Sequence, residues 1–454
     1  MNFAYAVLWS VVTATAAAYA LRVPVEGRWG RAVTAGGIGF FLVASMAAAL
    51  SPFVPIDFQS FWGLGRVLVA GGDATAFVAG HPLPPLNPPS AYPLFAAAGA
   101  LPLRAAIVAW TAVAAAASVA LVPVSRRTLA DRGVPGAADL NGWGLALLTS
   151  AFVISNAPRS MIQCGQVSFA TALGLIAALA CQSRGRPGWA GFWLVPGTIK
   201  PNTALPFFLL FLRRRDAKTW AVAGVLGVTV LLASGWARDP LRHVTTFART
   251  IEKHGKPGGV NDYTFTGTLS AGMVNLDYAF YRVGLHAPGS AGRAQLVAVA
   301  LMGAGLAVRV FRRRGDLATG GDCALVALYS MVFLYHRVHD CVVLALPLTY
   351  AVARARAATG KARWAFAASA GAVLLALAQQ RKAVELLEGV VKGRGDAAGR
   401  LVQALVLPYA TWLILGAMLA IVLGDRWAPE PIAAGMDRDR VGPGRERKAP
   451  VVVG

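Results

Sequence analysis

Charged side chains are scarce in this chain of 454 residues: they make up 14% of it, whereas 56% of the residues are hydrophobic. Soluble domains carry about 25% charged residues, so this composition excludes a soluble enzyme and predicts a polytopic membrane protein. The charge is also one-sided, with 43 Lys and Arg against 21 Asp and Glu. Because the basic residues stand in short clusters between apolar runs, topology signals and anionic lipid headgroups explain them better than nucleic acid does.

Cysteine is almost absent. The four cysteines, at positions 164, 181, 323 and 341, lie in or beside apolar runs and form no CxxC pair. This spacing argues against a zinc site and against thiol–disulfide chemistry, and small buried side chains are the default interpretation. We expect neither a metal nor a cofactor.

Three further features are missing, and each excludes a class of protein. No Gly-rich fingerprint follows a strand, so a nucleotide-binding Rossmann module is not expected. No internal repeat is found, which speaks against an inverted-repeat transporter. The first apolar run lacks a positive leading segment and a small-residue cleavage site, so we interpret it as a spanning helix and not as a signal peptide.

Apolar runs dominate the chain. A membrane span needs roughly 20 apolar residues, and this criterion predicts an all-α bundle of about 11–13 transmembrane helices with outer-face loops and interfacial helices. Residues 1–424 are expected to form one integral membrane domain, and residues 425–454 a basic, disordered cytoplasmic tail. The expected spans or partial spans are 1–21, 32–54, 94–103, 104–124, 142–155, 161–181, 189–212, 220–236, 294–311, 323–335, 341–352, 364–379 and 401–423.

The stretch around which the chain is organised begins with Ser51 and ends with Trp62. Pro52 and Pro55 end the apolar run before it, because proline removes a backbone donor and clashes with the preceding turn. Asp57 therefore stands at the outer membrane boundary. An ionisable group is expensive to place there and is a candidate for chemistry, although a solvated loop aspartate is the plain alternative.

The apolar segment 189–212 is interrupted by Pro196-Gly-Thr-Ile-Lys200-Pro201-Asn202. This pattern predicts a broken helix pair or a re-entrant hairpin. Irregular backbone at membrane depth requires cover from protein or a water-filled cavity. An ammonium group at the break, that of Lys200, requires an anionic partner or water.

Three other polar groups are expected near the same outer face as Asp57. They are residues 156–166 with Arg159, Gln163 and Gln166; residues 261–263, Asn-Asp-Tyr; and residues 336–340 with His336, Arg337, His339 and Asp340. Structural roles remain possible for each: Arg337 and Asp340 can pair with one another, the histidines can be interfacial, and Gln166 can join two helices. His, His and Asp are suitable metal ligands, but their spacing here matches no metal motif. A carboxylate among cations and amides suits a phosphorylated, hydroxyl-rich substrate.

The order of these motifs resembles that of the polyprenol-phosphate-sugar-dependent glycosyltransferases of the GT-C fold, and most of all the mannosyltransferase-like family 87 with the DUF2029 domain. The likeness runs from about residue 50 to 350. It is carried by Asp57, Tyr92-Pro93 to Leu103-Arg104, Gly165-Gln166, Gly191 through Ile199-Lys200-Pro201 to Arg213-Arg-Arg215, and His336–Asp340 followed by Leu344-Ala-Leu-Pro347.

The resemblance implies a cell-membrane enzyme that moves a hexose, such as mannose, from a polyprenyl phosphate to a hydroxyl of a lipid-linked or envelope glycan. It implies Asp57 as the general base of an inverting reaction at the extracytoplasmic face. The side chains expected to bind substrate are Arg159, Gln166, Lys200, Asn261, His336, Arg337, His339 and Asp340. Because the family places its catalytic loop after the first span, residues 1–21 look like an additional helix, which leaves the side of the N-terminus open.

Two alternatives stay open. A transporter or flippase of an anionic amphipathic lipid would use a similar basic cavity and the broken segment 189–212. A related GT-C enzyme would transfer another group, such as arabinose or phosphoethanolamine.

Overall fold

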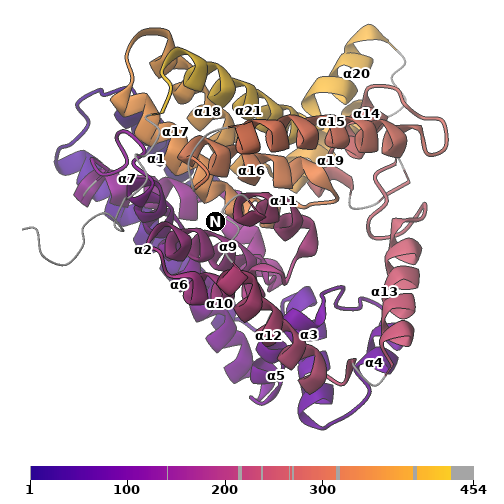
Figure 1. The fold of residues 1–454 in the computed structure, drawn as a ribbon. Coiled ribbons are helices and arrows are strands. Elements are labelled where there is room, and N and C mark those ends of the chain that lie inside the picture. Colours follow the sequence, from indigo (N-terminus) through magenta and orange to yellow (C-terminus); the bar gives the residue numbers. More distant parts are fainter. Residues whose placement is uncertain are drawn as a thin grey trace, which may run out of the picture.

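The structure is a computed structural model that describes residues 2–140, 142–212, 217–236, 239–264, 266–267, 270–312, 317–391 and 396–430. Within these ranges the named elements are all helices, and the isolated β-bridge pairs Met273 with Arg337. The predicted all-α fold is confirmed (Figure 1).

The helices of the first half are α1 (Asn2–Ala20), α2 (Arg28–Leu50), α3 (Ile56–Val69), α4 (Ala74–Gly80), η1 (Pro89–Ala91), α5 (Tyr92–Gly99), α6 (Leu103–Asp131), α7 (Gly142–Val153), α8 (Asn156–Cys164), α9 (Ser168–Ser183), α10 (Pro187–Gly197) and α11 (Pro201–Leu212). Those of the second half are α12 (Ala217–Ala233), α13 (Pro240–Gly255), η3 (Ser270–Gly272), α14 (Leu276–Arg282), α15 (Ser290–Arg312), α16 (Gly320–Phe333), η4 (Val338–Leu344), α17 (Ala345–Ala357), α18 (Gly360–Leu377), α19 (Arg381–Val391), α20 (Ala397–Leu401), η5 (Val402–Val406) and α21 (Tyr409–Trp427).

Five helices in the described part of the chain are long and apolar enough to cross a membrane, or up to seven if each of two bent pairs counts as one span. Several shorter apolar helices of 10–17 residues accompany them. The molecule is therefore a polytopic membrane protein, as predicted, while fewer helices meet the spanning criterion than the 11–13 expected. The five are Arg28–Leu50, Leu103–Asp131, Ser290–Arg312, Val338–Ala357 and Tyr409–Trp427.

Three element boundaries differ from, or refine, those predicted. Residues 156–160, which lie between the expected spans 142–155 and 161–181, begin helix α8, which lies at 53° to α7 and ends at the left-handed Gly165. The predicted break in 189–212 is present, because α10 ends at Gly197 and α11 starts at Pro201. The folded part also extends past residue 424: α21 runs to Trp427, and the buried Glu430 accepts hydrogen bonds from the backbone N–H groups of Gly320 and Gly321. The rest of the predicted tail, 431–454, lies outside the described residues.

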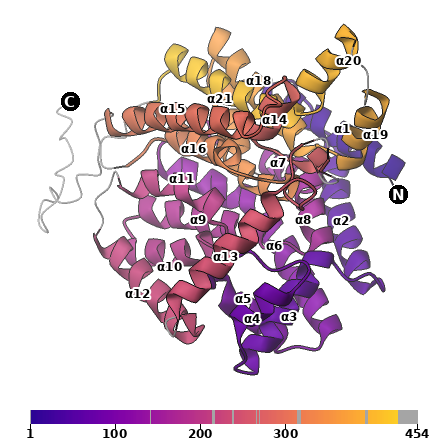
Figure 2. The ribbon, with the colours of Figure 1, turned by 90° about the vertical axis from the view of Figure 1, so that its right-hand side faces the viewer.

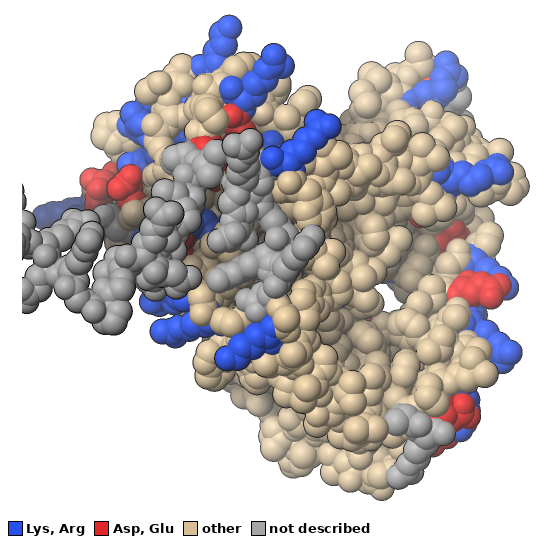
Figure 3. Space-filling model, viewed as in Figure 1, with Lys and Arg blue, Asp and Glu red and all other residues tan. Residues whose placement is uncertain are grey.

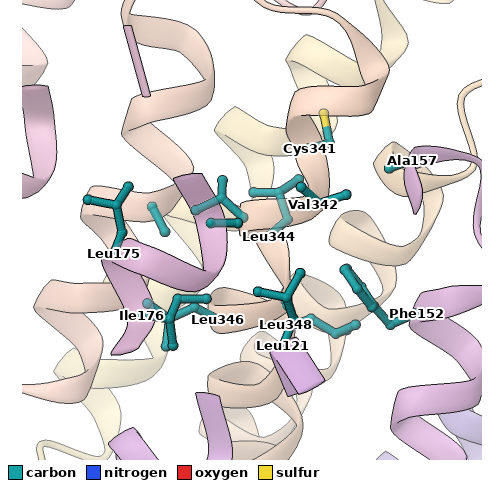
Figure 4. Packing of buried hydrophobic residues seen from close by; sticks show 14 of the residues in the cluster. Leu121, Phe152, Ala157, Leu175, Ile176, Cys341, Val342, Leu344, Leu346 and Leu348 are labelled. Atoms are coloured by element: carbon teal, nitrogen blue, oxygen red, sulfur yellow. The ribbon is translucent and has the colours of Figure 1, made fainter. Parts of the chain in front are cut away.

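Residues 338–355 are all buried, and this segment forms the centre of the bundle. Its leucines pack against side chains from α6, α7 and α9, as Figure 4 shows for Leu344, Leu346 and Leu348 beside Leu121 and Phe152. Within a membrane, close van der Waals packing of such side chains holds the helices together. The central segment is thereby fixed, and so are the polar residues at its start.

Basic helix ends meet on one side of the bundle. Arg184 at the end of α9 pairs with Asp131 at the end of α6, with 2.7 Å between Nη2 and Oδ2. Arg356 at the end of α17 donates to the carbonyl of Tyr19 at the end of α1, at 2.8 Å. Helix α6 starts on the opposite side of the bundle, beside the turn that precedes Asp57. A helix of this length spans about 43 Å. The positive-inside rule assigns the basic side to the cytoplasm.

The opposite side carries α3, α4, α5 and α13, which lie together at the lower right of Figure 1. Helix α13 is amphipathic and has no buried residue. Its start is fixed by an ion pair between Arg242 and Asp73 (3.0 Å) and by stacking of His243 on Trp236. Figure 2 shows α13 crossing the face that is turned toward the viewer, and Figure 3 shows a hollow in the surface beside it.

Candidate active site

The carboxylate of Asp57 is held by an amide from a distant segment. Asp57 lies in the first turn of α3, and its Oδ2 accepts a hydrogen bond of 2.7 Å from Nε2 of Gln166. Gln166 follows the helix end at Gly165, where φ is +71°. Both predicted residues therefore meet, and one oxygen of the carboxylate has a fixed direction.

A second carboxylate, that of Asp340, pairs with Lys200. The Lys200 ammonium contacts Oδ1 of Asp340, and the same oxygen accepts a bond of 2.7 Å from the hydroxyl of Ser168. The other oxygen, Oδ2, accepts from the backbone N–H of Arg337 at 3.2 Å and lies 3.4 Å from Nδ1 of His336. Only 12% and 4% of the Lys200 and Asp340 side chains are exposed, so this is a largely buried ion pair.

The break between α10 and α11 explains how Lys200 reaches this position. The Ile199 carbonyl, left without a helical partner at the break, accepts a bond of 3.2 Å from Nδ2 of Asn87. On the other side of the break, Nδ2 of Asn202 donates to the carbonyl of Tyr335 at 2.7 Å. The predicted anionic partner of Lys200 is thus present, and neighbouring segments cover the irregular backbone.

The Arg337 side chain does not form the suggested pair with Asp340. Its Nε donates to the hydroxyl of Tyr335, and its Nη2 donates to the Val260 carbonyl at 2.6 Å. The Arg337 side chain is kept from this pair because Asp340 is already surrounded by the Arg337 backbone and by donors from other helices. The guanidinium instead connects the start of the central segment to the outer loop.

The outer loop that Arg337 contacts is a compact turn built on Asp262. The carboxylate of Asp262 accepts bonds from the backbone N–H groups of Gly258 and Thr264, both at 2.8 Å, and from the hydroxyl of Thr266 at 2.6 Å. Burial alone would raise the pKa of Asp262, but these hydrogen bonds bring it below the ordinary value. The loop that contains the predicted group 261–263 therefore meets the group 336–340 through the Val260 carbonyl, and the hydrogen bonds of Asp262 hold this loop together.

The electrostatic surroundings of Asp57 suit a base. Burial raises the pKa of the Asp57 carboxyl, and the hydrogen bond from Gln166 and the charges of Lys200 and Arg337 only partly offset this effect. The net pKa is higher than the ordinary aspartate value of 3.8. A carboxylate with a raised pKa accepts a proton more readily than a solvated one.

Not all predicted residues join this group. Arg159 lies over the ring of Tyr5, 4.5 Å from its centroid, and it lines a different pocket together with Gln163. Asn261 contacts His254 through its backbone N–H (2.8 Å). The contacts described for these residues place neither beside Asp57.

The two histidines differ in their access to the site. His336 is completely buried behind Asp340, whereas His339 is 7% exposed with Nε2 3.7 Å from Oδ1 of Asp340. In the described part of the chain, no three His, Cys, Asp or Glu side chains are grouped so that they could hold a metal ion.

Sequence reasoning missed several members of the site. Ser168 could have been predicted as a site residue, because it lies two positions after Gln166 at the start of α9. The hydroxyl of Tyr335 stands next to the His336–Asp340 cluster and could also have been noted. The carbonyl of Val260 could not have been found, since a backbone acceptor leaves no trace in residue type.

Replacement of Gly165 by alanine is expected to disturb the site. The left-handed backbone disfavours a side chain, and a Cβ at this position would lie 2.4 Å from Cβ of Phe58, the neighbour of Asp57. Displacement of a catalytic group by about 1 Å can cost 10²-fold in rate, so we expect a loss of that order in transfer activity. The matched control is Gly185→Ala, where φ is +65° but nothing lies within 4 Å. Equal losses in both variants would mean that backbone strain, and not contact with Phe58, is responsible.

Comparison with protein families gave one match: the model described as Glycosyltransferase family 87 matches residues 86–335. The matched stretch includes Gln166, Ser168 and Lys200; residues 336–340 follow it directly, and Asp57 precedes it. Comparison of the chain with curated proteins and with solved structures found no match.

Proposed function

Because the chain belongs to glycosyltransferase family 87, and because a fixed, half-buried carboxylate lies beside two cations, we propose that it transfers a hexose, in the first instance mannose, from a polyprenyl phosphate. The acceptor is a hydroxyl of a lipid-linked or envelope glycan at the extracytoplasmic face of the cell membrane. The family and the fold identify the protein as a membrane glycosyltransferase.

Asp57 acts as the general base in this proposal. The acceptor oxygen attacks the anomeric carbon while its proton passes to the carboxylate, and the bond between that carbon and the phosphate oxygen breaks. A single displacement of this kind inverts the anomeric configuration. The bond from Gln166 to Oδ2 leaves Oδ1 to receive the proton, and this contact is the observation that supports the assignment most directly.

Lys200 and Arg337 stabilise the departing phosphate in this proposal. An ammonium has three N–H donors, and the structure directs one of them to Asp340. The guanidinium has five, of which two are directed to Tyr335 and Val260. Donors aimed at developing charge in a poorly hydrated site contribute strongly to catalysis. Asp340 and the buried His336 then position the two cations. His339 lies beside Asp340 and helps to hold it in place.

The direct test uses the purified chain in lipid nanodiscs with radiolabelled polyprenyl-phosphate-mannose and an extract of envelope lipids. We expect label to appear in a new lipid or glycan product. A donor that binds but is never consumed, with mannose or with other sugars, would contradict the proposal. That result would favour a flippase of an anionic lipid, whose activity is measured instead as movement of labelled lipid between leaflets.

The pH dependence of transfer offers a second prediction. A base must be ionised to act, so a raised pKa of Asp57 places the acidic fall of kcat at a pH above the ordinary aspartate value. Gln166→Leu removes a hydrogen bond that lowers this pKa, and the acidic fall should therefore move to higher pH. The control is Gln163→Leu, a glutamine at the other side of α8 that lines a different pocket. An unchanged pH profile in Gln166→Leu would remove Asp57 from the role of titrating base.

A further inference from the structure

An open groove lies between the starts of α10 and α12, on the side of the bundle where the basic helix ends meet. Its volume is about 640 Å³, within the roughly 300–1,000 Å³ of small-molecule sites. Figures 1 and 2 both show α10 and α12 lying next to one another. The lining includes the side chains of Arg186 and Lys218, the rings of Trp189 and Phe192, and Gly188.

Two glycines of α10 explain how the groove is both fixed and open. At Gly191 the two helices pack tightly, because an added Cβ would lie 2.4 Å from the carbonyl oxygen of Thr219. One turn earlier, a Cβ added at Gly188 would meet only Cε of Lys218, at 4.0 Å. The groove therefore begins just where the close contact between α10 and α12 ends.

Two cations line this groove without an acidic partner. Arg186 and Lys218 are both exposed, and within the described part of the chain neither side chain forms a hydrogen bond or an ion pair. Arg184, two positions before Arg186, is by contrast paired with Asp131. A guanidinium and an ammonium beside one groove attract an anion, and both groups are suited to bind phosphate oxygens.

An apolar surface continues from the groove along α12. Lys218 and Val222 share one helical face with Val225 and Leu232, because these positions are separated by three, four or seven residues. Val225 is 66% exposed, Leu232 is 62% exposed, and Trp189 on the facing helix is 60% exposed. In a membrane protein, exposed valine and leucine side chains contact acyl chains, and tryptophan is typical of the headgroup level. The cations thus lie at the end of a lipid-facing surface.

We propose that this groove binds one anionic glycerophospholipid of the cytoplasmic leaflet, with its phosphate between Arg186 and Lys218 and an acyl chain along α12. The two cations select an anion, and the apolar face that begins beside Lys218 selects a lipid over a soluble phosphate. The occupant is a resident lipid and not the sugar donor, because α10 separates the groove from the break at Lys200. A helix of its 11 residues spans about 16 Å. The inference does not depend on the proposed transfer reaction.

The test is native mass spectrometry of the purified full chain with two lipids of identical acyl chains, phosphatidylglycerol and phosphatidylcholine. We expect one retained phosphatidylglycerol, bound about thirtyfold more tightly than phosphatidylcholine, because each basic residue beside an anionic lipid contributes about fivefold. Arg186→Gln combined with Lys218→Gln should abolish this preference. Gly188→Phe, which fills the groove and keeps both cations, should abolish retention of both lipids. The matched control is Arg28→Gln combined with Arg31→Gln, which removes the same charge from the exposed start of α2, outside the groove, and should leave the preference unchanged.

Four outcomes would overturn the proposal. A full preference for phosphatidylglycerol in the Arg186 and Lys218 double variant would show that these cations do not bind the headgroup. Undiminished retention in Gly188→Phe would place the lipid elsewhere, even if the double variant fails to fold. Displacement of the lipid by stoichiometric polyprenyl phosphate would identify the groove as a substrate site. Displacement by inorganic phosphate would identify a soluble anion as the occupant.

Discussion

Asp57→Asn is expected to lower the rate of sugar transfer by about 10²–10⁴-fold, the usual contribution of a positioned general base. Asparagine keeps the size of the side chain and an oxygen that can accept from Gln166, so the local structure should persist. What it loses is the ability to take the acceptor proton. Transfer of label and binding of the donor are measured on the same sample, and donor binding should stay within about threefold of wild type.

The control for this variant is Asp73→Asn. Asp73 lies on the same outer side, caps α4 and is 45% exposed, and asparagine is an equally good helix cap. We expect its transfer rate to stay within about twofold of wild type, because surface ion pairs contribute little. Transfer by Asp57→Asn at the rate of this control would leave the enzyme class standing but would exclude Asp57 as the base.

Loss of the Asp340 charge should have the largest effect on stability. Asp340→Asn leaves the Lys200 ammonium without its carboxylate in a site where only 12% of the lysine side chain is exposed. Removal of one partner from a buried ion pair costs about 3–5 kcal/mol, so the free energy of unfolding should fall by that amount. Denaturant-induced unfolding in detergent, or the midpoint of thermal unfolding, measures the change.

A double variant separates pairing from packing. In Lys200→Met combined with Asp340→Asn, no uncompensated charge remains, and the loss of stability should be smaller than in Asp340→Asn alone. Transfer should nevertheless stay impaired, because the proposed phosphate-binding ammonium is gone. Additive losses in the double variant would mean that the two side chains do not interact energetically.

The membrane class and the helical architecture could be read from the sequence because both follow from local properties. The length of an apolar run sets whether it spans, and a proline within it sets where the helix breaks. The break at Lys200 was predicted for this reason. Helix α8 was not, because Asn156-Ala-Pro-Arg-Ser160 reads as a turn, although a proline in the first turn of a helix is well tolerated.

The sequence predicted several residues of the candidate site, but it did not predict which side chains contact one another. The sequence indicated Asp57, Gln166 and Asp340 as polar groups near one face and Lys200 as an ammonium at a helix break, and the structure brings all four together. It also suggested Arg337 as a partner of Asp340 and Arg159 as a substrate ligand. The Arg337 side chain instead contacts Tyr335 and Val260, and Arg159 turns to the other side of α8.

By itself, then, the sequence determined that this chain is an all-helical membrane protein with an ionisable group at the end of an apolar run, since those properties depend on neighbours along the chain. Only the tertiary structure decided which donors meet which carboxylates. Gln166 reaches Asp57 across 109 positions, and Lys200 reaches Asp340 across 140. Contacts at such separation depend on how helices pack and bend, and residue types along the chain do not specify that geometry.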